Sequence, residues 1–243
     1  MKQATLTLLT NKALTPDVYE MRLAGADRPV PGSFLEIGLD GFFLKRPFGA
    51  AGYKDGVLTV YYRVVGAGTE AMTRLSEGAK LEALTMLGTG FNYTGVTRPL
   101  IVSGGLGIAP LKYLADCFHE AGVRPAFVAG FRCRSDAILI DELSKICDLF
   151  VTTDDGSLGY HGNAVEFLKQ NPVAFDRYFA CGPEPMLRGM QRFSVNGQLS
   201  LEARMGCGFG ACMGCSITTV SGYKRVCKEG PVFDAGEVIF DAR

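Results

Sequence analysis

The pattern of apolar and polar positions divides the chain near residue 98. Before this point, short stretches of β-branched and aromatic residues are interrupted by Gly, Pro or Asp every few positions. Many short runs of this kind with a single helix predict a small closed antiparallel β-barrel over residues 1–97. The expected strands cover 5–9, 18–23, 34–39, 57–65 and 80–84, and the expected helix covers 69–75.

Beyond residue 98, continuous apolar runs alternate with segments of helical periodicity. The run PLIVSGG (99–105) is typical of a parallel strand that is buried on both faces. Repetition of strand and helix predicts a doubly wound α/β domain with a parallel sheet over residues 98–197. Further strands are expected at 125–131, 148–153 and 177–182, and helices at 108–121, 139–146, 163–170 and 184–196.

The last part of the chain, residues 198–243, contains four cysteines at the spacing C-x4-C-x2-C-x11-C, which is typical of plant-type [2Fe–2S] clusters. Interleaved glycines permit positive φ and allow N–H groups to point at sulfur. Structural zinc is the main alternative, although zinc sites usually contain two short C-x2-C pairs. A disulfide framework fits less well, and the lack of histidine in this segment excludes a Rieske centre. A hairpin-like stretch is expected over 231–240.

Charge and cysteine content narrow the class of protein. The 243 residues include 25 basic and 25 acidic side chains, so no net field favours a nucleic-acid or membrane partner. The N-terminal stretch lacks an apolar core of signal-peptide length, and no run is long enough to span a bilayer. Eight cysteines in such a chain indicate metal ligands or free thiols in a reducing compartment. The composition therefore predicts a soluble cytoplasmic protein.

Two motifs stand at strand ends of the predicted α/β domain. In VSGGLGIAP, Gly104, Gly105 and Gly107 would let a pyrophosphate approach the backbone where a helix begins, although a glycine-rich turn also serves packing. In ACGPEPM, Cys181 follows a strand, so we expect it beside the nicotinamide; a small buried core residue is the alternative. The polar loop 152–162 either contacts the cofactor or is only a turn.

Two stretches of the predicted barrel carry a similar signal. Arg46 stands beside a proline in FLKRPFGAAGY, and Arg63 precedes the glycine-rich turn 66–69, where a helix start would offer N–H groups to an anion. Taken alone, each stretch is better explained by a structural role, a surface ion pair for the arginine or a turn that ends a strand. Together with a nucleotide fold and an iron–sulfur loop they indicate a flavin, because a flavin exchanges both single electrons and hydrides.

These motifs resemble a known family. R-P followed by G-x-G-T, then G-G-x-G-x-A-P and C-G-P-x-x-M, are similar to the ferredoxin–NADP reductase superfamily. The segment MGCGFGACMGC…VCKEGPVFDAGEV resembles the electron-transfer subunits of type B, NAD-dependent dihydroorotate dehydrogenase. The resemblance covers essentially the whole chain. It implies an FAD-binding barrel (1–97), an NAD-binding α/β domain (98–197) and a small [2Fe–2S] domain (198–243).

The resemblance also implies roles for particular residues. Arg46 and Pro47 match the start of the flavin motif, whose arginine holds the FAD phosphates. Gly49 stands where relatives commonly have serine, which leaves the hydrogen-bond partner of flavin N5 open, and the flavin-stacking aromatic is Phe48, Tyr53 or another residue. The other predicted cofactor-binding residues are Tyr61, Tyr62, Arg63, Gly68, Thr69, Gly104, Gly105, Gly107, Cys181, Gly182 and Pro183, and the predicted cluster ligands are Cys207, Cys212, Cys215 and Cys227.

By the same resemblance, the chain is an electron-transfer subunit and needs no catalytic acid–base residue. A partner subunit containing FMN would oxidise dihydroorotate, and electrons would pass through [2Fe–2S] and FAD to NAD+ in UMP biosynthesis. The resemblance implies a heterotetramer of two catalytic and two electron-transfer subunits. His119 and His161 are expected at the surface.

Other interpretations stay open. The chain could belong to a related reductase whose donor is ferredoxin or sulfide, or it could be a regulatory module that binds nucleotide and zinc. Coenzyme choice is open as well, because Arg132 and Arg134 follow the second strand of the nucleotide fold. They would either meet the 2′-phosphate of NADP or be solvated loop charges, and the family favours NAD.

Overall fold

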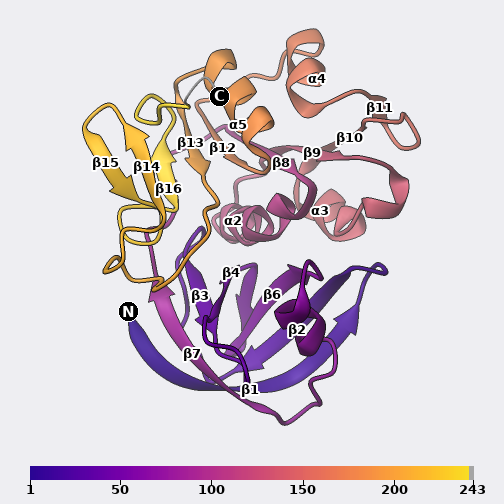
Figure 1. The fold of residues 1–243 in the computed structure, drawn as a ribbon. Coiled ribbons are helices and arrows are strands. Elements are labelled where there is room, and N and C mark those ends of the chain that lie inside the picture. Colours follow the sequence, from indigo (N-terminus) through magenta and orange to yellow (C-terminus); the bar gives the residue numbers. More distant parts are fainter. Residues whose placement is uncertain (241–243) are drawn as a thin grey trace.

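The computed structural model describes residues 1–240 and places them around two seven-stranded sheets (Figure 1). The first sheet is antiparallel and has the order β4-β3-β7-β1-β2-β6-β5. A short helix, α1 (Ala67–Met72), follows β6. The strands are β1 (Lys2–Ala13), β2 (Val18–Ala24), β3 (Phe34–Ile37), β4 (Arg46–Gly49), β5 (Gly52–Lys54), β6 (Val57–Arg63) and β7 (Lys80–Leu87).

The predicted antiparallel barrel is confirmed as a half-barrel, whose sheet does not close completely but stays open at one seam. Alternate apolar residues such as Leu6 and Leu58 fill its interior. Strands β4 and β5 form the two ends of the hydrogen-bonded order. The corner between them is held instead by single bonds, from the N–H of Ala50 to the carbonyl of Ser33 (3.0 Å) and from the N–H of Ala51 to that of Thr59 (2.9 Å). The seam between β4 and β5 is therefore spanned by the short connection through Ala50 and Ala51 rather than by a ladder of strand hydrogen bonds.

The second sheet has the order β11-β10-β9-β8-β12-β13-β16, and all its pairs are parallel except β13 with β16. Its strands are β8 (Pro99–Gly104), β9 (Ala126–Phe131), β10 (Asp148–Thr153), β11 (Tyr160–His161), β12 (Arg177–Cys181), β13 (Gly197–Ser200) and β16 (Val232–Asp234). The helices are α2 (Ile108–Glu120), α3 (Ile140–Ile146), α4 (Ala164–Gln170) and α5 (Glu184–Phe193), with 3-10 turns at Gly105–Gly107 and Arg134–Asp136.

Apolar side chains on both faces of this sheet make it doubly wound, as predicted. Ile101 packs in the apolar cluster that contains α2 and α3, whereas its neighbours Leu100 and Val102 pack in the cluster with α4 and α5. Helix α2 also reaches the barrel: Tyr113 belongs to the barrel core and donates its hydroxyl to the carbonyl of Pro29 (2.9 Å). The barrel and the α/β domain therefore share a packed interface.

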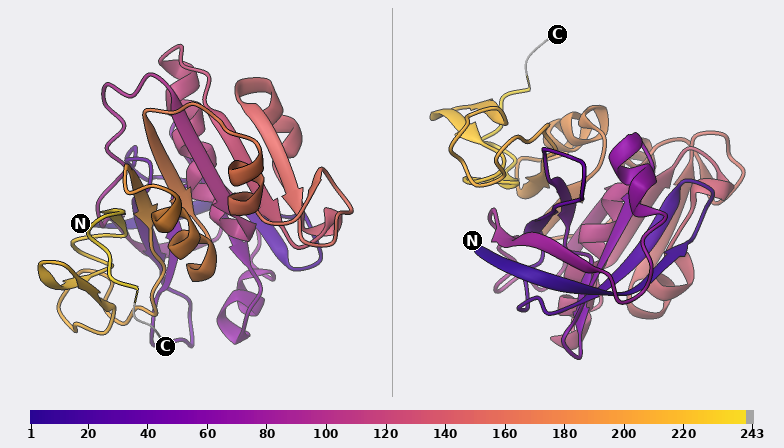
Figure 2. Two further views of the ribbon diagram at one scale, coloured as in Figure 1. Left: turned by 90° about the horizontal axis from the view of Figure 1, so that it is seen from above. Right: turned by 60° about the horizontal axis from the view of Figure 1, so that its bottom comes forward.

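The cysteine segment lies at the side of both domains (Figures 1 and 2). It contributes β13 and β16 to the second sheet, so the third predicted domain range begins within a strand of that sheet. The hairpin expected over 231–240 is wrong, because β16 pairs with β13 and Val238 bridges to Thr219. A hairpin forms instead from β14 (Ser216–Thr219) and β15 (Gly222–Arg225). No helix within residues 1–240 combines the length and apolar character needed to cross a bilayer.

Candidate functional site

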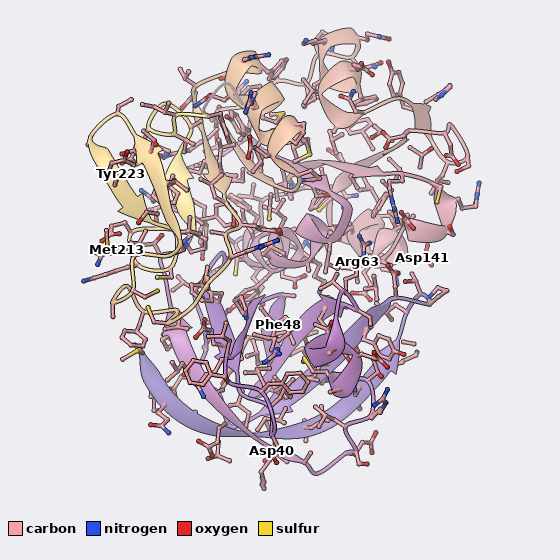
Figure 3. All side chains as sticks on the ribbon, viewed as in Figure 1. Asp40, Phe48, Arg63, Asp141, Met213 and Tyr223 are labelled. Atoms are coloured by element: carbon pink, nitrogen blue, oxygen red, sulfur yellow. The ribbon has the colours of Figure 1, made fainter. Side chains whose placement is uncertain are left out.

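A cavity of about 670 Å³ lies between the barrel, the start of α2 and the end of β12. It is lined by all of the predicted cofactor-binding residues except Gly68. Figure 3 shows Phe48 on the barrel side, below the α/β domain. Sequence motifs that are more than a hundred residues apart therefore meet in one space, whose size is within the range of cofactor sites.

Arg46 begins β4 and is held in place by its surroundings. Its guanidinium carbon lies 4.3 Å from the centre of the Phe42 ring, and one of its nitrogens donates to the carbonyl of Leu44. The guanidinium also lies against Gly68, where an added Cβ would be 2.3 Å from Arg46 Nε. Gly68 thus contributes space for Arg46 rather than cavity surface.

The turn before α1 is organised by Thr69. Its hydroxyl accepts the N–H groups of Val65 (2.9 Å) and Gly66 (3.2 Å) and donates to the carbonyl of Gly66 (3.0 Å). Gly66 has an extended φ of 177°. The turn therefore presents its backbone at the edge of the cavity beside Arg46.

Tyr61 and Tyr62 are neighbours on β6 with different surroundings. Tyr61 packs with Ala51 and Ala109 at the domain interface and donates to Glu20 (3.0 Å), and burial together with Glu20 raises its pKa well above the usual range. Tyr62 is buried in the barrel core, where it stacks on Tyr19 with ring centres 5.3 Å apart. Both residues nevertheless contribute to the cavity wall.

The remaining barrel candidates separate into cavity residues and core residues. Arg63 pairs through Nε with Asp17 (3.1 Å), so the ion-pair interpretation applies to it, although it also lines the cavity. Phe48 belongs to the barrel core and also lines the cavity, whereas Tyr53 packs against the same core, does not line the cavity and donates to the carbonyl of Ala26 (3.0 Å). The structure thus favours Phe48 over Tyr53 as an aromatic neighbour of a bound ring.

The position of Gly49 explains what a side chain there would meet. An added Cβ would lie 3.4 Å from Pro110 Cβ, in the first turn of α2. That distance is ordinary van der Waals contact, so a serine would fill the gap between barrel and helix rather than clash.

The glycines at the ends of β8 and β12 have two functions. A Cβ on Gly107 would lie 2.3 Å from the carbonyl oxygen of Cys181, and one on Gly104 would lie 2.7 Å from Pro183, so these glycines let two turns pack together. Gly105 is different: its φ is +53° and an added Cβ would meet no atom within 4 Å. In this motif, Gly104 and Gly107 therefore allow close packing, whereas Gly105 leaves the backbone accessible to a ligand.

Cys181 is only 3% exposed, yet it lines the cavity. Burial raises its pKa to about 12, against a smaller lowering effect of Ser200, so the side chain is a neutral thiol at physiological pH. Sequence analysis missed Glu202, which lines the same wall two residues after the end of β13. Loss of solvation beside the protein raises the pKa of its carboxyl group. No local motif marks Glu202, because its position at the ligand-binding edge follows only from the pairing of β13 with β12.

The cavity wall continues directly into the cysteine segment. Met205 lines the cavity and precedes Cys207 by two residues. Cys215 and Cys227 are buried, Cys207 is partly buried and Cys212 is exposed. The first cluster thiol therefore lies close to the rim of the cavity.

The four thiols lie as two pairs. Cys207 interacts with Cys212, and Cys227 with Cys215. Among the described residues, no three Cys, His, Asp or Glu side chains are gathered closely enough to hold a single metal ion. This pairing accords with the expected [2Fe–2S] cluster, in which four thiolates share two irons.

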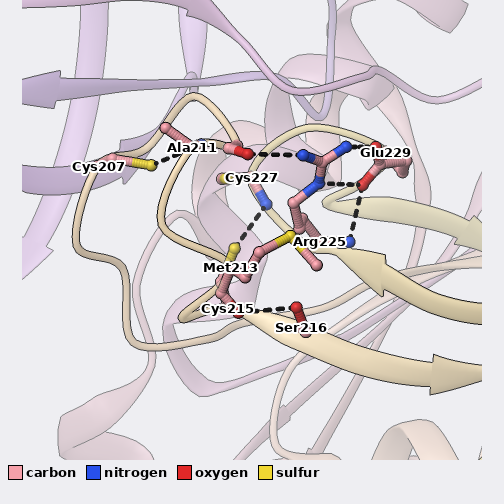
Figure 4. A network of polar contacts seen from close by, with 9 residues as sticks. Cys207, Ala211, Met213, Cys215, Ser216, Arg225, Cys227 and Glu229 are labelled. Atoms are coloured by element: carbon pink, nitrogen blue, oxygen red, sulfur yellow. Dashed lines mark hydrogen bonds and ion pairs between the residues drawn. The ribbon is translucent and has the colours of Figure 1, made fainter.

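Backbone groups of the loop point at sulfur, as a cluster loop requires. The N–H of Ala211 donates to Cys207 Sγ (3.2 Å), and the N–H of Cys227 donates to Cys215 Sγ (3.4 Å) (Figure 4). The N–H of Cys212 also donates to Cys207 Sγ (3.4 Å). Burial raises the pKa of Cys207, but these hydrogen bonds outweigh it and lower the pKa to about 6. The loop thus stabilises the thiolate of Cys207, which is the form that binds iron, whereas burial raises the pKa of Cys227 to about 12.

Arg225 on β15 connects this loop to the hairpin and is itself paired with Glu229 (Figure 4). Arg225 donates to the carbonyl of Gly210 (2.6 Å) and, through Nε, to Glu229 (3.0 Å). Hydrogen bonds from Arg225 lower the pKa of Glu229 to about 2. The residues present therefore fit a flavin in the cavity and an iron–sulfur cluster beside it.

The coenzyme-selectivity candidates lie outside the cavity. Arg132 pairs with Asp136 (2.7 Å), and Arg134 donates through Nε to the carbonyl of Ser157 (3.1 Å). The loop 152–162 is internally bonded, with Asp155 accepting the N–H of Ser157 (2.9 Å). Hydrogen bonds and an ion pair thus join the loops that follow β9 and β10.

Comparison with known proteins agrees with this geometry. Residues 202–239 match the family described as the iron–sulfur cluster binding domain of dihydroorotate dehydrogenase B. The electron transfer subunit of dihydroorotate dehydrogenase B (NAD(+)) from Caldanaerobacter subterraneus subsp. tengcongensis is 37% identical, over 96% of this chain and 97% of that protein. The subunit of the same name from Fusobacterium nucleatum subsp. nucleatum is 34% identical over 98% and 99%.

Solved structures share the architecture. The structure of an NADH-dependent reduced ferredoxin–NADP oxidoreductase superposes with a TM-score of 0.86 at 26% identity, covering 96% of this chain and 89% of the other. Phthalate dioxygenase reductase superposes with a TM-score of 0.67 at 16% identity, covering 91% and 76%. The second likeness shows the common fold alone.

Proposed function

The chain belongs to the family of electron transfer subunits of dihydroorotate dehydrogenase B (NAD(+)), and we propose that it carries electrons from a catalytic partner subunit to NAD+ in pyrimidine biosynthesis. The observation that carries this proposal is the continuity of one wall: flavin-motif and nicotinamide-motif residues line a single cavity whose rim leads into the four-cysteine loop. FAD, when bound, supplies the exchange between hydride pairs and single electrons.

The barrel side of the cavity would hold the flavin. Arg46, positioned by Gly68, would donate paired hydrogen bonds to the FAD phosphates, assisted by the backbone of the turn that Thr69 organises. Phe48 and Tyr61 would border the ring, and the backbone at Gly49 would face flavin N5.

The α/β side of the cavity would hold NAD+. The unobstructed backbone at Gly105 would bind the pyrophosphate, because ligands bind at the carboxyl ends of parallel strands where a helix begins. Cys181, a neutral thiol, and Glu202 would border the nicotinamide. Hydride transfer between two stacked rings needs close positioning and exclusion of water rather than an acid–base group, which accords with the mainly apolar walls.

The cluster domain, as the resemblance divides the chain (residues 198–243), would face the partner. Phe209 and Met213, both in the cysteine loop, are 44% and 51% exposed, and Figure 3 shows Met213 on the outer side of this segment. Exposed apolar side chains around a cluster suit a protein partner. We infer that this partner contains FMN, oxidises dihydroorotate and forms a heterotetramer of two plus two subunits with this chain.

We also infer a cytoplasmic location. None of the eight cysteines, all of which lie within the described residues, forms a disulfide; Cys117 and Cys147 are buried and lie apart from the predicted cluster ligands. Such usage is typical of a reducing compartment.

Purified chain alone tests the proposal. It should bind FAD and oxidise NADH with ferricyanide or a dye, and it should not turn over dihydroorotate. The catalytic partner should restore NAD+ reduction by dihydroorotate. Dihydroorotate oxidation by the isolated chain would contradict the division of labour.

A ferredoxin-linked reductase is the second candidate, and the TM-score of 0.86 to the NADH-dependent ferredoxin–NADP oxidoreductase favours it. The two functions differ in the electron donor. Reduction of NAD+ by reduced ferredoxin, at a rate that dihydroorotate with the catalytic partner does not reach, would support this alternative.

A further inference from the structure

Glu36 is a buried carboxylate at an unusual place in the barrel. It lies on β3, is 1% exposed, and its Oε1 has no hydrogen-bond partner among the described residues. An unpaired buried carboxylate destabilises a fold, and an apolar residue of similar size would pack there at lower cost. Packing alone therefore does not account for Glu36.

The outer face of β3 is the platform for the cysteine segment. Leu35 and Ile37 point into the barrel core, so Phe34 and Glu36 point the other way. Phe34 packs in the same apolar cluster as Cys215 and Cys227. Glu36 thus stands beneath the cluster loop, on a face that is otherwise apolar.

Contact between Glu36 and the loop is direct. A Cβ added to Gly208, the residue after Cys207, would lie 2.2 Å from the carboxyl carbon of Glu36. On its other side, Glu36 is paired across the sheet with Pro47, which lines the cavity. The carboxylate therefore lies between the flavin cavity and the cluster loop.

The electrostatic surroundings of Glu36 are consistent with this placement. Burial raises its pKa to about 7, Cys207 adds to the rise, and Lys45 opposes it. Lys45 forms no ion pair with Glu36 in the described part of the chain, so the carboxylate charge is not neutralised by a direct partner. A negative charge in a poorly solvated position acts strongly on other charges nearby.

We propose that Glu36 tunes the reduction potential of the cluster held by the four cysteines, lowering it and so making the cluster a stronger donor toward FAD. The inference rests on the proposed function, because it requires the cluster. Reduction adds one electron and one negative charge beside an existing negative charge, which makes the reduced form less favourable. Glu36 thus acts on the cluster only through its negative charge and does not itself exchange electrons.

A redox titration followed by electron paramagnetic resonance tests this. The anaerobically purified complex of this chain with its catalytic partner is titrated with dithionite, which supplies one electron per cluster, at about pH 9, far above the ordinary pKa of a carboxyl group. Glu36→Gln keeps the volume and removes the charge. It should favour reduction about tenfold, a shift of 59 mV to more positive potential for a one-electron couple.

Two variants serve as controls. Glu36→Asp keeps the charge and should leave the midpoint potential near that of the wild type. Glu82→Gln removes an exposed carboxylate from the neighbouring strand β7 and should also leave it unchanged, because water screens that charge. Iron and sulfide content are measured for every variant.

Three outcomes decide the matter. An unchanged midpoint potential in Glu36→Gln with full iron content would overturn the proposal. Loss of iron in both Glu36→Gln and Glu36→Met would overturn it as well, since Glu36 would then be a support for the loop. Absence of a cluster in the wild type would instead contradict the proposed function.

Discussion

Replacing Gly68 by alanine is a selective way to displace Arg46. The added Cβ would lie 2.3 Å from both Nε and Nη2 of Arg46, so the guanidinium must leave its place between Gly68 and the Phe42 ring. The backbone of α1 is not obstructed, and alanine favours a helix over glycine by about 1 kcal/mol. The fold should therefore be unharmed while the arginine moves.

The expected cost follows from the bonds that Arg46 would make to FAD. Hydrogen bonds to a charged group contribute about 1.5–3 kcal/mol. Their loss corresponds to roughly a ten- to hundredfold rise in the Kd of FAD. Gly66→Ala is the matched control, because it lies in the same turn, has an extended φ and would place its Cβ at least 4 Å from any other group.

Reconstitution of the apoprotein with FAD, followed by flavin fluorescence, measures both Kd values. Thermal unfolding of the two apoproteins confirms that neither is destabilised. Equal FAD affinity in Gly68→Ala and Gly66→Ala would refute the role of Arg46 in holding the phosphates.

The other predictions concern the cluster and the domain boundary. Cys212→Ser should lose the visible absorption of the cluster and retain NADH–dye activity in the isolated chain; equal loss of both would mean that the cluster only supports folding. Gly208→Ala, with its Cβ 2.2 Å from Glu36 and a φ of +70°, should lower iron content, whereas Gly222→Ala, which has a φ of +105° but no atom within 4 Å of an added Cβ, should retain it; equal iron content would contradict the contact. Hydrogen bonds from the linker before β8 depress the pKa of Asp176, so its stabilisation is complete at neutral pH and is lost as pH falls below about 4. Asp176→Asn should therefore flatten the acid dependence of the unfolding free energy, and an unchanged slope would argue against these bonds.

Long apolar runs made the α/β domain predictable. A run such as 99–105 that ends in glycine is typical of a strand buried on both faces, and β8, β9, β10 and β12 form where such runs end in glycine or a turn. The short strands contain too few residues to show a periodic apolar pattern. Strands β4 and β5 have four and three residues and include proline or glycine, so their pairing was not visible in sequence.

Features that depend on distant segments were also missed. The alternation in β3 indicates that Glu36 faces away from the barrel core, but not that residues 206–215 cover it. The segment 231–240 reads as a hairpin locally, yet the open edge of β13 captures β16. Glu202 lies in no local motif and becomes visible only when β13 is placed beside β12. The motif residues, by contrast, converge because strand ends share one edge of a parallel sheet.

The proposed electron path is tested most directly by the electron paramagnetic resonance spectrum of this chain in complex with its catalytic partner. The complex is mixed anaerobically with dihydroorotate in the absence of NAD+. The account predicts the signal of a reduced [2Fe–2S] cluster, which disappears when NAD+ is added and NADH forms. NADH formation from dihydroorotate in a complex whose cluster never shows that signal and contains no iron would contradict it.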